Sequence, residues 1–104
     1  MTGWTFLLLA GLVEIAWAQS IRPTDGFTRL WPTLLCIALG ATSVYLLSRA
    51  MQTVPVGTAY AVFTGIGVIG TVVLGIVLAG DPATPLRLAA LALIVAGVAL
   101  ARLA

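Results

Sequence analysis

Glu14 is the residue whose position in this sequence most clearly indicates chemistry. It lies inside the apolar run 3–21, which contains no other charged residue. At about 1.5 Å per residue, a helix of that length spans ~27 Å, close to the ~30 Å hydrocarbon core of a bilayer. A charged side chain at that depth costs about 2.5–3.5 kcal/mol, so Glu14 is either a neutral, hydrogen-bonded structural acid or a functional carboxylate. We favour the functional interpretation because no other acid lies in an apolar run.

Helical spacing indicates which residues share the face of Glu14. The positions three and four residues away carry small side chains and one aromatic ring: Ala10, Gly11, Trp17 and Ala18. Bulkier side chains lie largely on the other faces and suit lipid: Leu8, Leu9, Leu12 and Ile15. The spacing therefore places Trp17 beside the carboxylate.

Ser43, Tyr60 and Phe63 are further candidates for the same site. One face of the run 31–49 consists of Cys36, Gly40, Ser43 and Leu47. The Ser43 hydroxyl either bonds to the carbonyl four residues earlier in its own helix, the commoner arrangement, or faces a ligand. Tyr60, in the run 56–79, is either an interfacial aromatic or a buried group whose hydroxyl needs Glu14 as its acceptor. We favour the site role for Tyr60, with Phe63 one turn along.

The segment 65–70, GIGVIG, matches the GxGxxG fingerprint of dinucleotide-binding folds, but its context excludes that function. The fingerprint requires a preceding strand and a helix N-terminus that holds pyrophosphate. Here the segment lies in the middle of an apolar run. Gly65 and Gly67 are therefore interpreted as sites of close helix approach or as a hinge, and Gly97 as part of a slim packing face in the run 86–103 that joins protomers.

The composition places the chain among membrane proteins. Of its 104 residues 62% are hydrophobic and only 8% are charged, and the mean hydropathy is +1.19. A soluble domain carries about 25% charged residues. We predict an all-α, single-domain protein of residues 1–104 with four transmembrane helices at about 3–21, 31–49, 56–79 and 86–103. Residues 16–18 fit a small-x-small cleavage pattern, but the first run lacks a basic N-terminal region and contains an acid, which argues against a signal peptide.

The same composition argues against several functions. The chain has no histidine and one cysteine, Cys36, so no metal site, internal disulfide or other cofactor is expected. The five arginines flank the apolar runs rather than forming a basic stripe, which argues against nucleic-acid binding. We expect a carrier in the bilayer and not an enzyme.

The arginines also give little preference for one orientation in the membrane. Arg49 and Arg102 are expected at the edge that holds both termini, and Arg22, Arg29 and Arg87 at the opposite edge. With the N-terminal amine counted, the two edges are balanced, and the positive-inside rule then permits insertion both ways. Four helices can hardly enclose a pathway, so we predict an antiparallel dimer with two Glu14 side chains facing one another near the midplane.

These features resemble the small multidrug resistance family of four-helix, proton-coupled exporters. The similarity covers nearly the whole chain and rests on four motifs: Glu14-Ile15, DGFTRLWP at 25–32, PVGTAYA at 55–61 and GIG at 65–67. Trp17-Ala18 and the segment TGIG at 64–67 resemble the guanidinium-exporter branch, whereas the multidrug branch usually has Gly-Thr after the acid. The resemblance implies that Glu14 binds both proton and substrate, that Ser43 and Trp17 support it by hydrogen bonding, and that Tyr60 lines the site.

Two residues depart from the family pattern. Phe63 stands where most members carry tryptophan, and Arg22 replaces the usual lysine. The resemblance implies export of guanidinium or small guanidinyl cations across the cytoplasmic (inner) membrane. Phe63 keeps two alternatives open: export of quaternary ammonium and other organic cations, and a role as one half of a paired heterodimer with a homologous chain. A third possible function is that of a membrane subunit that transports nothing, and this function would not explain why a carboxylate lies within an apolar helix.

The chemistry of one submerged carboxylate agrees with that resemblance. A proton and a cation compete for it, so exchange follows from mutual exclusion. Guanidinium is planar and donates a forked pair of hydrogen bonds to a carboxylate, with Trp17 able to bond or stack nearby. A quaternary ammonium ion has no N–H group to donate and needs aromatic walls, of which Phe63 supplies one.

Overall fold

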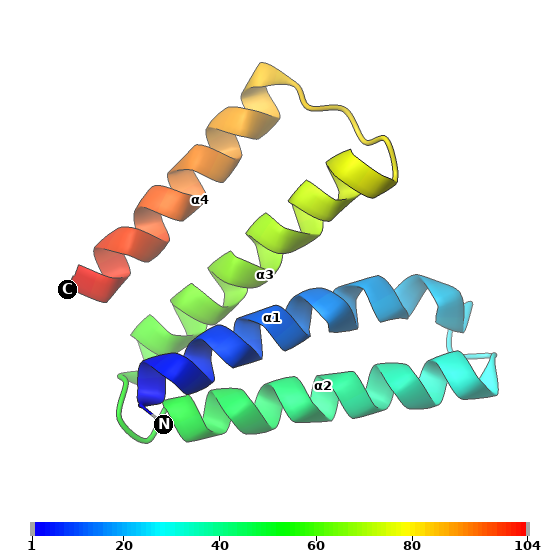
Figure 1. The fold of residues 1–104 in the computed structure, drawn as a ribbon, viewed down its shortest axis with the longest axis horizontal. Helices are drawn as coiled ribbons and strands as arrows, with labels where there is room; N and C mark the ends of the chain where they lie inside the picture. The colour runs from blue at the N-terminus through cyan, green and yellow to red at the C-terminus, as the bar shows by residue number, and fades with distance from the viewer. Residues whose placement is uncertain (1, 104) are drawn as a thin grey trace.

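The computed structural model, which describes residues 2–103, consists of four long helices (Figure 1). They are α1 (Gly3–Ile21), α2 (Leu30–Ala50), α3 (Val56–Leu78) and α4 (Pro85–Leu103), with a short 3-10 turn, η1 (Arg22–Thr24), after α1. The expected ranges for the last three helices differ from these bounds by one residue at some ends, within the usual fraying of helix termini. The expected all-helical class with four helices is confirmed.

All four helices are long and apolar enough to cross a membrane. With 19 to 23 residues each, they span about 29–35 Å, which matches the hydrocarbon core. Many large apolar side chains are exposed on the single chain, Leu8 and Leu12 among them. In water such a surface would drive aggregation, whereas in lipid it is the ordinary outer surface of a membrane protein. The protein is therefore a multi-pass membrane protein.

The buried core lies at one end of the helices. It is formed by the first half of α1, the end of α2, the α2–α3 loop and the start of α3: Leu7, Ala10, Leu47, Ala50, Val54, Ala59, Val62 and Phe63. The antiparallel pair α1 and α2 packs closely along its length, and α3 and α4 diverge from it away from this core (Figure 1). The result is a flat wedge of 42 × 36 × 18 Å. Glu14 lies beyond the core, where α1 still packs against α3 at Gly67.

Helix α4 is the least integrated element. None of its residues is buried, and it packs along α3. The contact depends on Gly65, because a side chain there would collide with Val98. Gly97, expected to pack, faces open space within the described chain, since nothing lies within 4 Å of the position its Cβ would occupy. Any packing role of Gly97 therefore requires a second chain.

Helix ends follow local chemistry. The Thr2 hydroxyl accepts a hydrogen bond from the Thr5 amide at 3.2 Å, and Thr84 caps α4 by accepting from the Arg87 amide at 3.2 Å. Helix α3 stops where Gly80 adopts a positive φ of 72°, a conformation that glycine reaches without steric cost.

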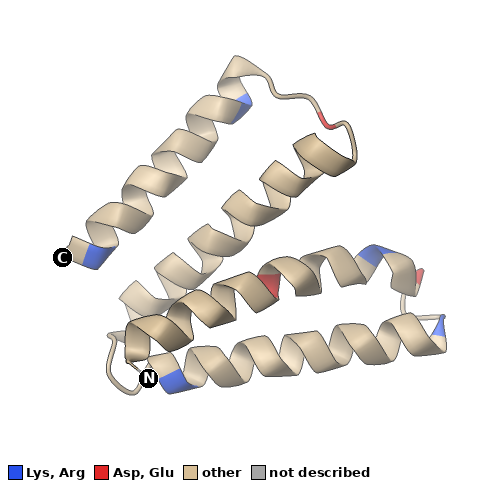
Figure 2. Ribbon diagram, in the orientation of Figure 1, with Lys and Arg blue, Asp and Glu red and all other residues tan. Residues whose placement is uncertain are grey.

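The arginines lie at the helix ends, where the blue segments in Figure 2 mark them. Arg49 and Arg102 are in the last turns of α2 and α4, close to the N-terminal end of α1. Arg22, Arg29 and Arg87 belong to the loops and helix starts at the opposite edge. Both membrane edges therefore carry positive charge in similar amounts.

Candidate functional site

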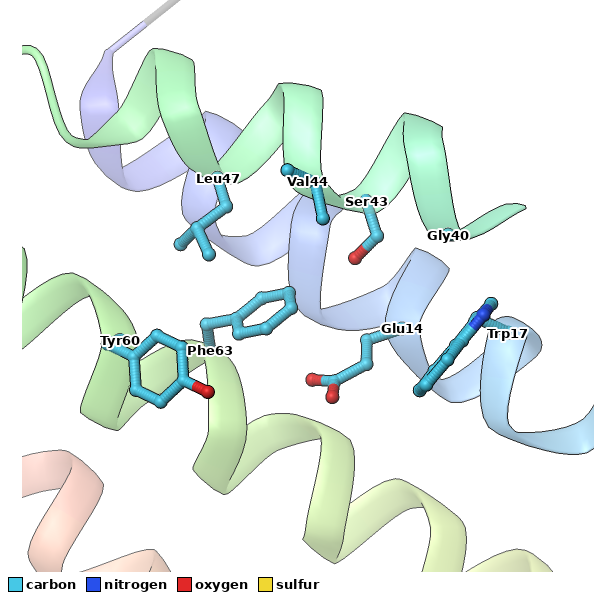
Figure 3. Close-up of a pocket in the computed structure, with 8 residues that line it drawn as sticks. All are labelled: Glu14, Trp17, Gly40, Ser43, Val44, Leu47, Tyr60 and Phe63. Atoms are coloured by element: carbon cyan, nitrogen blue, oxygen red, sulfur yellow. The ribbon is translucent and has the colours of Figure 1, made fainter. Parts of the chain in front are cut away.

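Glu14 opens into a cavity of about 320 Å³ between α1, α2 and α3 (Figure 3). Its lining consists of Glu14, Trp17, Gly40, Ser43, Val44, Leu47, Tyr60 and Phe63. The five residues that the sequence singled out for a site, from three separate helices, thus line one space. That volume is within the range of about 300–1,000 Å³ typical of small-ligand pockets.

The Glu14 carboxylate rests against the backbone of α3. A side chain at Gly67 would collide with Oε2 of Glu14, so the glycine makes room for the acid. Oε2 is buried and has no hydrogen-bond partner among residues 2–103. A buried carboxylate oxygen without a partner is costly, so this atom is prepared to accept a hydrogen bond from something outside the chain.

Ser43 ties α2 to the turn of α1 that carries Glu14. It is only 3% exposed, and its hydroxyl donates to the backbone carbonyl of Ala10 at 3.0 Å. The favoured expectation of a bond to the carbonyl four residues earlier in its own helix is therefore wrong, and a hydrogen bond to Glu14 is not formed either. The close approach of α1 and α2 brings a carbonyl of the neighbouring helix within reach. Because the Ala10 carbonyl lies one turn before Glu14, Ser43 fixes the height of the acid relative to α2.

Trp17 is positioned by the absence of a side chain at Gly40. A Cβ at Gly40 would lie 2.9 Å from Nε1 of Trp17 and 3.2 Å from its Cδ1. The edge of the indole that carries Nε1 therefore faces α2 at Gly40, and Figure 3 shows the ring beside Glu14 at one end of the cavity. The tryptophan can there present its ring face to a bound cation, whereas its N–H group is a donor and can serve only an acceptor.

Tyr60 and Phe63 form the aromatic end of the cavity. Their ring centroids are 6.1 Å apart and their planes are inclined by 45°. Phe63 is buried, but Tyr60 is 57% exposed, which contradicts the expectation that Tyr60 is buried. The expected hydrogen bond from Tyr60 to Glu14 is not among the bonds formed by the described residues, although the hydroxyl points into the cavity (Figure 3). Its neighbours Ala59 and Val62 are buried, so Tyr60 is exposed because it lies on a face of α3 that the other helices leave uncovered within one chain.

A second cavity of about 310 Å³ borders Glu14 from its other side. It is lined by Glu14, Gly67, Val68, Thr71 and Val72. Gly67 and Thr71 are one turn apart on α3 and therefore share a face of that helix. Glu14 thus lines two cavities.

Sequence reasoning missed two contributions to the site. Gly67 was interpreted as a packing or hinge residue and Gly40 only as a member of the helix face that carries Ser43, yet each faces a functional side chain, Glu14 and Trp17 respectively. Ile15, assigned to lipid, lies against Gly70 of α3. The signal for these contacts is weak, because helical periodicity defines the face of a residue but not the helix that meets it.

Comparison with known proteins agrees with this architecture. The family model described as "Small Multidrug Resistance protein" matches residues 2–94. A protein of Citrobacter freundii and one of Salmonella typhimurium, both named guanidinium exporter, are 54% identical to this chain over 95 residues, covering 91% of it and 90% of their own length. A guanidinium exporter of Escherichia coli K12 is 50% identical over the same extent. These relatives are named as exporters and not as enzymes.

The family match covers most of the chain, and the structure has four helices long enough to cross a membrane. The resemblance seen in the sequence is confirmed: this chain belongs to the small multidrug resistance family.

Proposed function

We propose that this protein exports guanidinium or small guanidinyl cations across the cytoplasmic membrane in exchange for protons. The observation that carries the proposal is Glu14, whose buried Oε2 has no hydrogen-bond partner among the described residues and which lines a cavity together with Trp17. The relatives named guanidinium exporters, 50–54% identical to this chain, support the choice of substrate.

The binding step follows from the chemistry of the cavity. Guanidinium donates two parallel N–H hydrogen bonds to a carboxylate, which would satisfy the unpartnered Oε2 and neutralise the charge of Glu14. The Trp17 indole beside the acid offers a ring face to the planar cation. Ser43 acts indirectly, since its hydroxyl is bound to the Ala10 carbonyl and holds α1 in register with α2.

Coupling follows from the fact that one carboxylate serves two ligands. A proton on Glu14 removes the charge and one acceptor that guanidinium needs, and a bound guanidinium disfavours protonation. Exchange requires that only the guanidinium-bound and the protonated forms of the carrier change their opening from one side of the membrane to the other. Each guanidinium ion carried outward is then followed by a proton carried inward. No further charged group in the apolar segments is needed.

We further propose that the working unit is an antiparallel dimer of this chain or of a pair with a homologous chain. Within one copy Tyr60 is 57% exposed and no residue of α4 is buried. A second chain could therefore bury both the aromatic end of the site and the surface of α4. The positive charges at the two edges are nearly balanced, which permits both orientations. Two inverted copies would place two Glu14 residues at one midplane site between alternating openings.

The test is guanidinium-driven proton movement in proteoliposomes that contain the purified protein and a pH-sensitive dye. In vesicles that contain the protein, an inward guanidinium gradient is expected to drive protons out and to raise the internal pH. In vesicles without protein, the same gradient is expected to leave the internal pH unchanged. Glu14→Gln is expected to abolish the signal. Asp81→Asn, which changes an exposed carboxylate in the α3–α4 loop, is the matched control and is expected to retain it. A Glu14→Gln protein that exchanges like the wild type would contradict the proposal.

The aromatic end of the cavity supports a second candidate, export of larger organic cations. Tyr60 and Phe63 provide the ring faces that a quaternary ammonium ion requires. The same vesicles distinguish the two functions. A proton signal with tetrapropylammonium and none with guanidinium would replace the first candidate with the second.

A further inference from the structure

A third cavity lies away from Glu14, at the membrane edge that holds the N-terminal end of α1 and the C-terminal end of α4. It has a volume of about 270 Å³ and is lined by residues of α1, α3 and α4: Trp4, Leu8, Val62, Ile66, Val98, Ala99 and Arg102. Val62 is 2% exposed and forms its floor, while Leu8 and Ala99 are exposed at its sides. The space is an apolar groove with one charged residue.

Arg102 provides the charge at the outer end of this groove. Its guanidinium lies over the ring of Trp4, 4.5 Å from the ring centroid, and the side chain is exposed. A cation stacked in this way keeps its N–H groups free in the plane of the guanidinium. Trp4 and Arg102 are side chains of the kinds that favour the level of the lipid head groups.

The surrounding edge is positive and has no acidic side chain to balance it. Arg49 lies on the same edge, over the ring of Phe6 at 5.0 Å, and donates to the Tyr45 hydroxyl at 3.0 Å. The three acidic residues of the chain are elsewhere: Glu14 within α1, and Asp25 and Asp81 in the two loops at the opposite edge. The groove therefore combines an apolar wall at the depth of acyl chains with the exposed Arg102 cation at the depth of head groups.

We propose that this groove binds one anionic phospholipid per chain. The phosphate accepts hydrogen bonds from Arg102, and one acyl chain lies along Leu8, Ile66 and Val98. Acyl chains are as apolar as the side chains they would displace, so selectivity comes from the head group, and basic pockets between transmembrane helices are known to favour anionic lipids. A choline head group would bring its own cation close to Arg102 and is disfavoured.

The experiment is native mass spectrometry of the full-length protein released from detergent micelles that contain palmitoyl-oleoyl phosphatidylglycerol or the phosphatidylcholine with the same chains. The wild type is expected to retain one phosphatidylglycerol per chain and to retain phosphatidylcholine poorly. Arg102→Gln is expected to weaken phosphatidylglycerol binding about fivefold, and Arg102→Lys to preserve most of it. Arg87→Gln, which removes the arginine at the other end of α4, is the matched control and is expected to bind like the wild type.

Three results would overturn the proposal. The first is an equal loss of phosphatidylglycerol in the Arg87→Gln and Arg102→Gln proteins, which would mean that only overall charge matters. The second is equal retention of the two lipids by the wild type. The third is that the Arg102→Gln protein is detected as a monomer where the wild type is detected as a dimer, with no change in bound lipid. That result would mean that a second copy of the chain occupies the groove. None of these readouts depends on guanidinium transport.

Discussion

At the scale of single residues, the site is organised around Glu14, whose carboxylate is held in place by packing while its Oε2 receives no hydrogen bond from the described residues. Oε2 of Glu14 is buried and unpartnered among residues 2–103, although a serine and a tyrosine lie in the same cavity. The Ser43 hydroxyl is already bound to a backbone carbonyl. The carboxylate is thereby left as the acceptor for whatever enters, which is the arrangement that a shared site for proton and cation requires.

This competition predicts how guanidinium binding depends on pH. Protons and guanidinium exclude one another at Glu14, so at pH values below the pKa of the acid each unit of acidification is expected to weaken the apparent affinity about tenfold. At higher pH the affinity is expected to reach a plateau, because the carboxylate is then ionised in all copies. Isothermal titration of the purified protein with guanidinium between pH 5 and 9 measures both limits.

The control for that titration is Glu14→Asp, which keeps a carboxylate and is expected to keep the pH dependence with a displaced midpoint. An affinity for guanidinium that stays constant across the whole range would show that Glu14 does not hold both ligands.

At the scale of the helices, glycines determine how the functional side chains are positioned. Gly67 admits the Glu14 carboxylate to the surface of α3, and Gly40 admits the Trp17 indole to the surface of α2. In each case a methyl group would displace the facing side chain rather than the backbone. Close helix approach at small residues is common in membranes, and here it also determines the position of the site.

Gly40→Ala tests this role of small residues. The new methyl group would lie 2.9 Å from Nε1 of Trp17, so the indole has to move. We expect guanidinium affinity to fall about tenfold, which corresponds to ~1.4 kcal/mol, while the protein still folds. The measurements are guanidinium titration and thermal unfolding in detergent. Gly57→Ala is the matched control, since nothing lies within 4 Å of that position, and an equal effect of the two substitutions on affinity would contradict the explanation.

The helices and their faces could be predicted from the sequence, but the contacts between them could not. The apolar runs indicate four helices, and the periodicity identifies the face of α2 on which Cys36, Ser43 and Leu47 are buried. The acceptor of Ser43 and the packing of Ile15 against Gly70 depend on where two helices cross. The exposure of Tyr60, between the buried Ala59 and Val62, depends on which face of α3 the other helices cover. Neither property is encoded in the period of a single helix.

At the scale of the whole molecule, the chain is a wedge whose two membrane edges carry similar positive charge. Arg49 and Arg102 lie at one edge, and Arg22, Arg29 and Arg87 lie at the other. Orientation in the membrane is set by the difference in lysine and arginine between the edges, and here that difference is small. One added charge is therefore enough to shift the balance.

We expect reporter fusions to the C-terminus to show the wild type in both orientations. Gln52→Lys adds a cation to the α2–α3 loop, beside Arg49, and should bias the chain towards a cytoplasmic location of that edge. Ala83→Lys, in the α3–α4 loop, should produce the opposite bias, and Gln52→Asn is the uncharged control. Each lysine variant alone is expected to lose transport, and co-expression of the two should restore it. A wild type found in one orientation only would contradict an antiparallel dimer of two copies of this chain.

Helix α4 makes a complete mutational scan of this chain unusually informative. Since none of its 19 residues is buried within one copy, the fold of that copy places few demands on their identity beyond being apolar. Away from Val98 and Ala101, which pack against the core of the same chain, intolerance to apolar exchanges along α4 would therefore map neighbours outside the polypeptide, whether protein or lipid. In this helix, the positions that tolerate no substitution would identify the surface that contacts other molecules in the membrane.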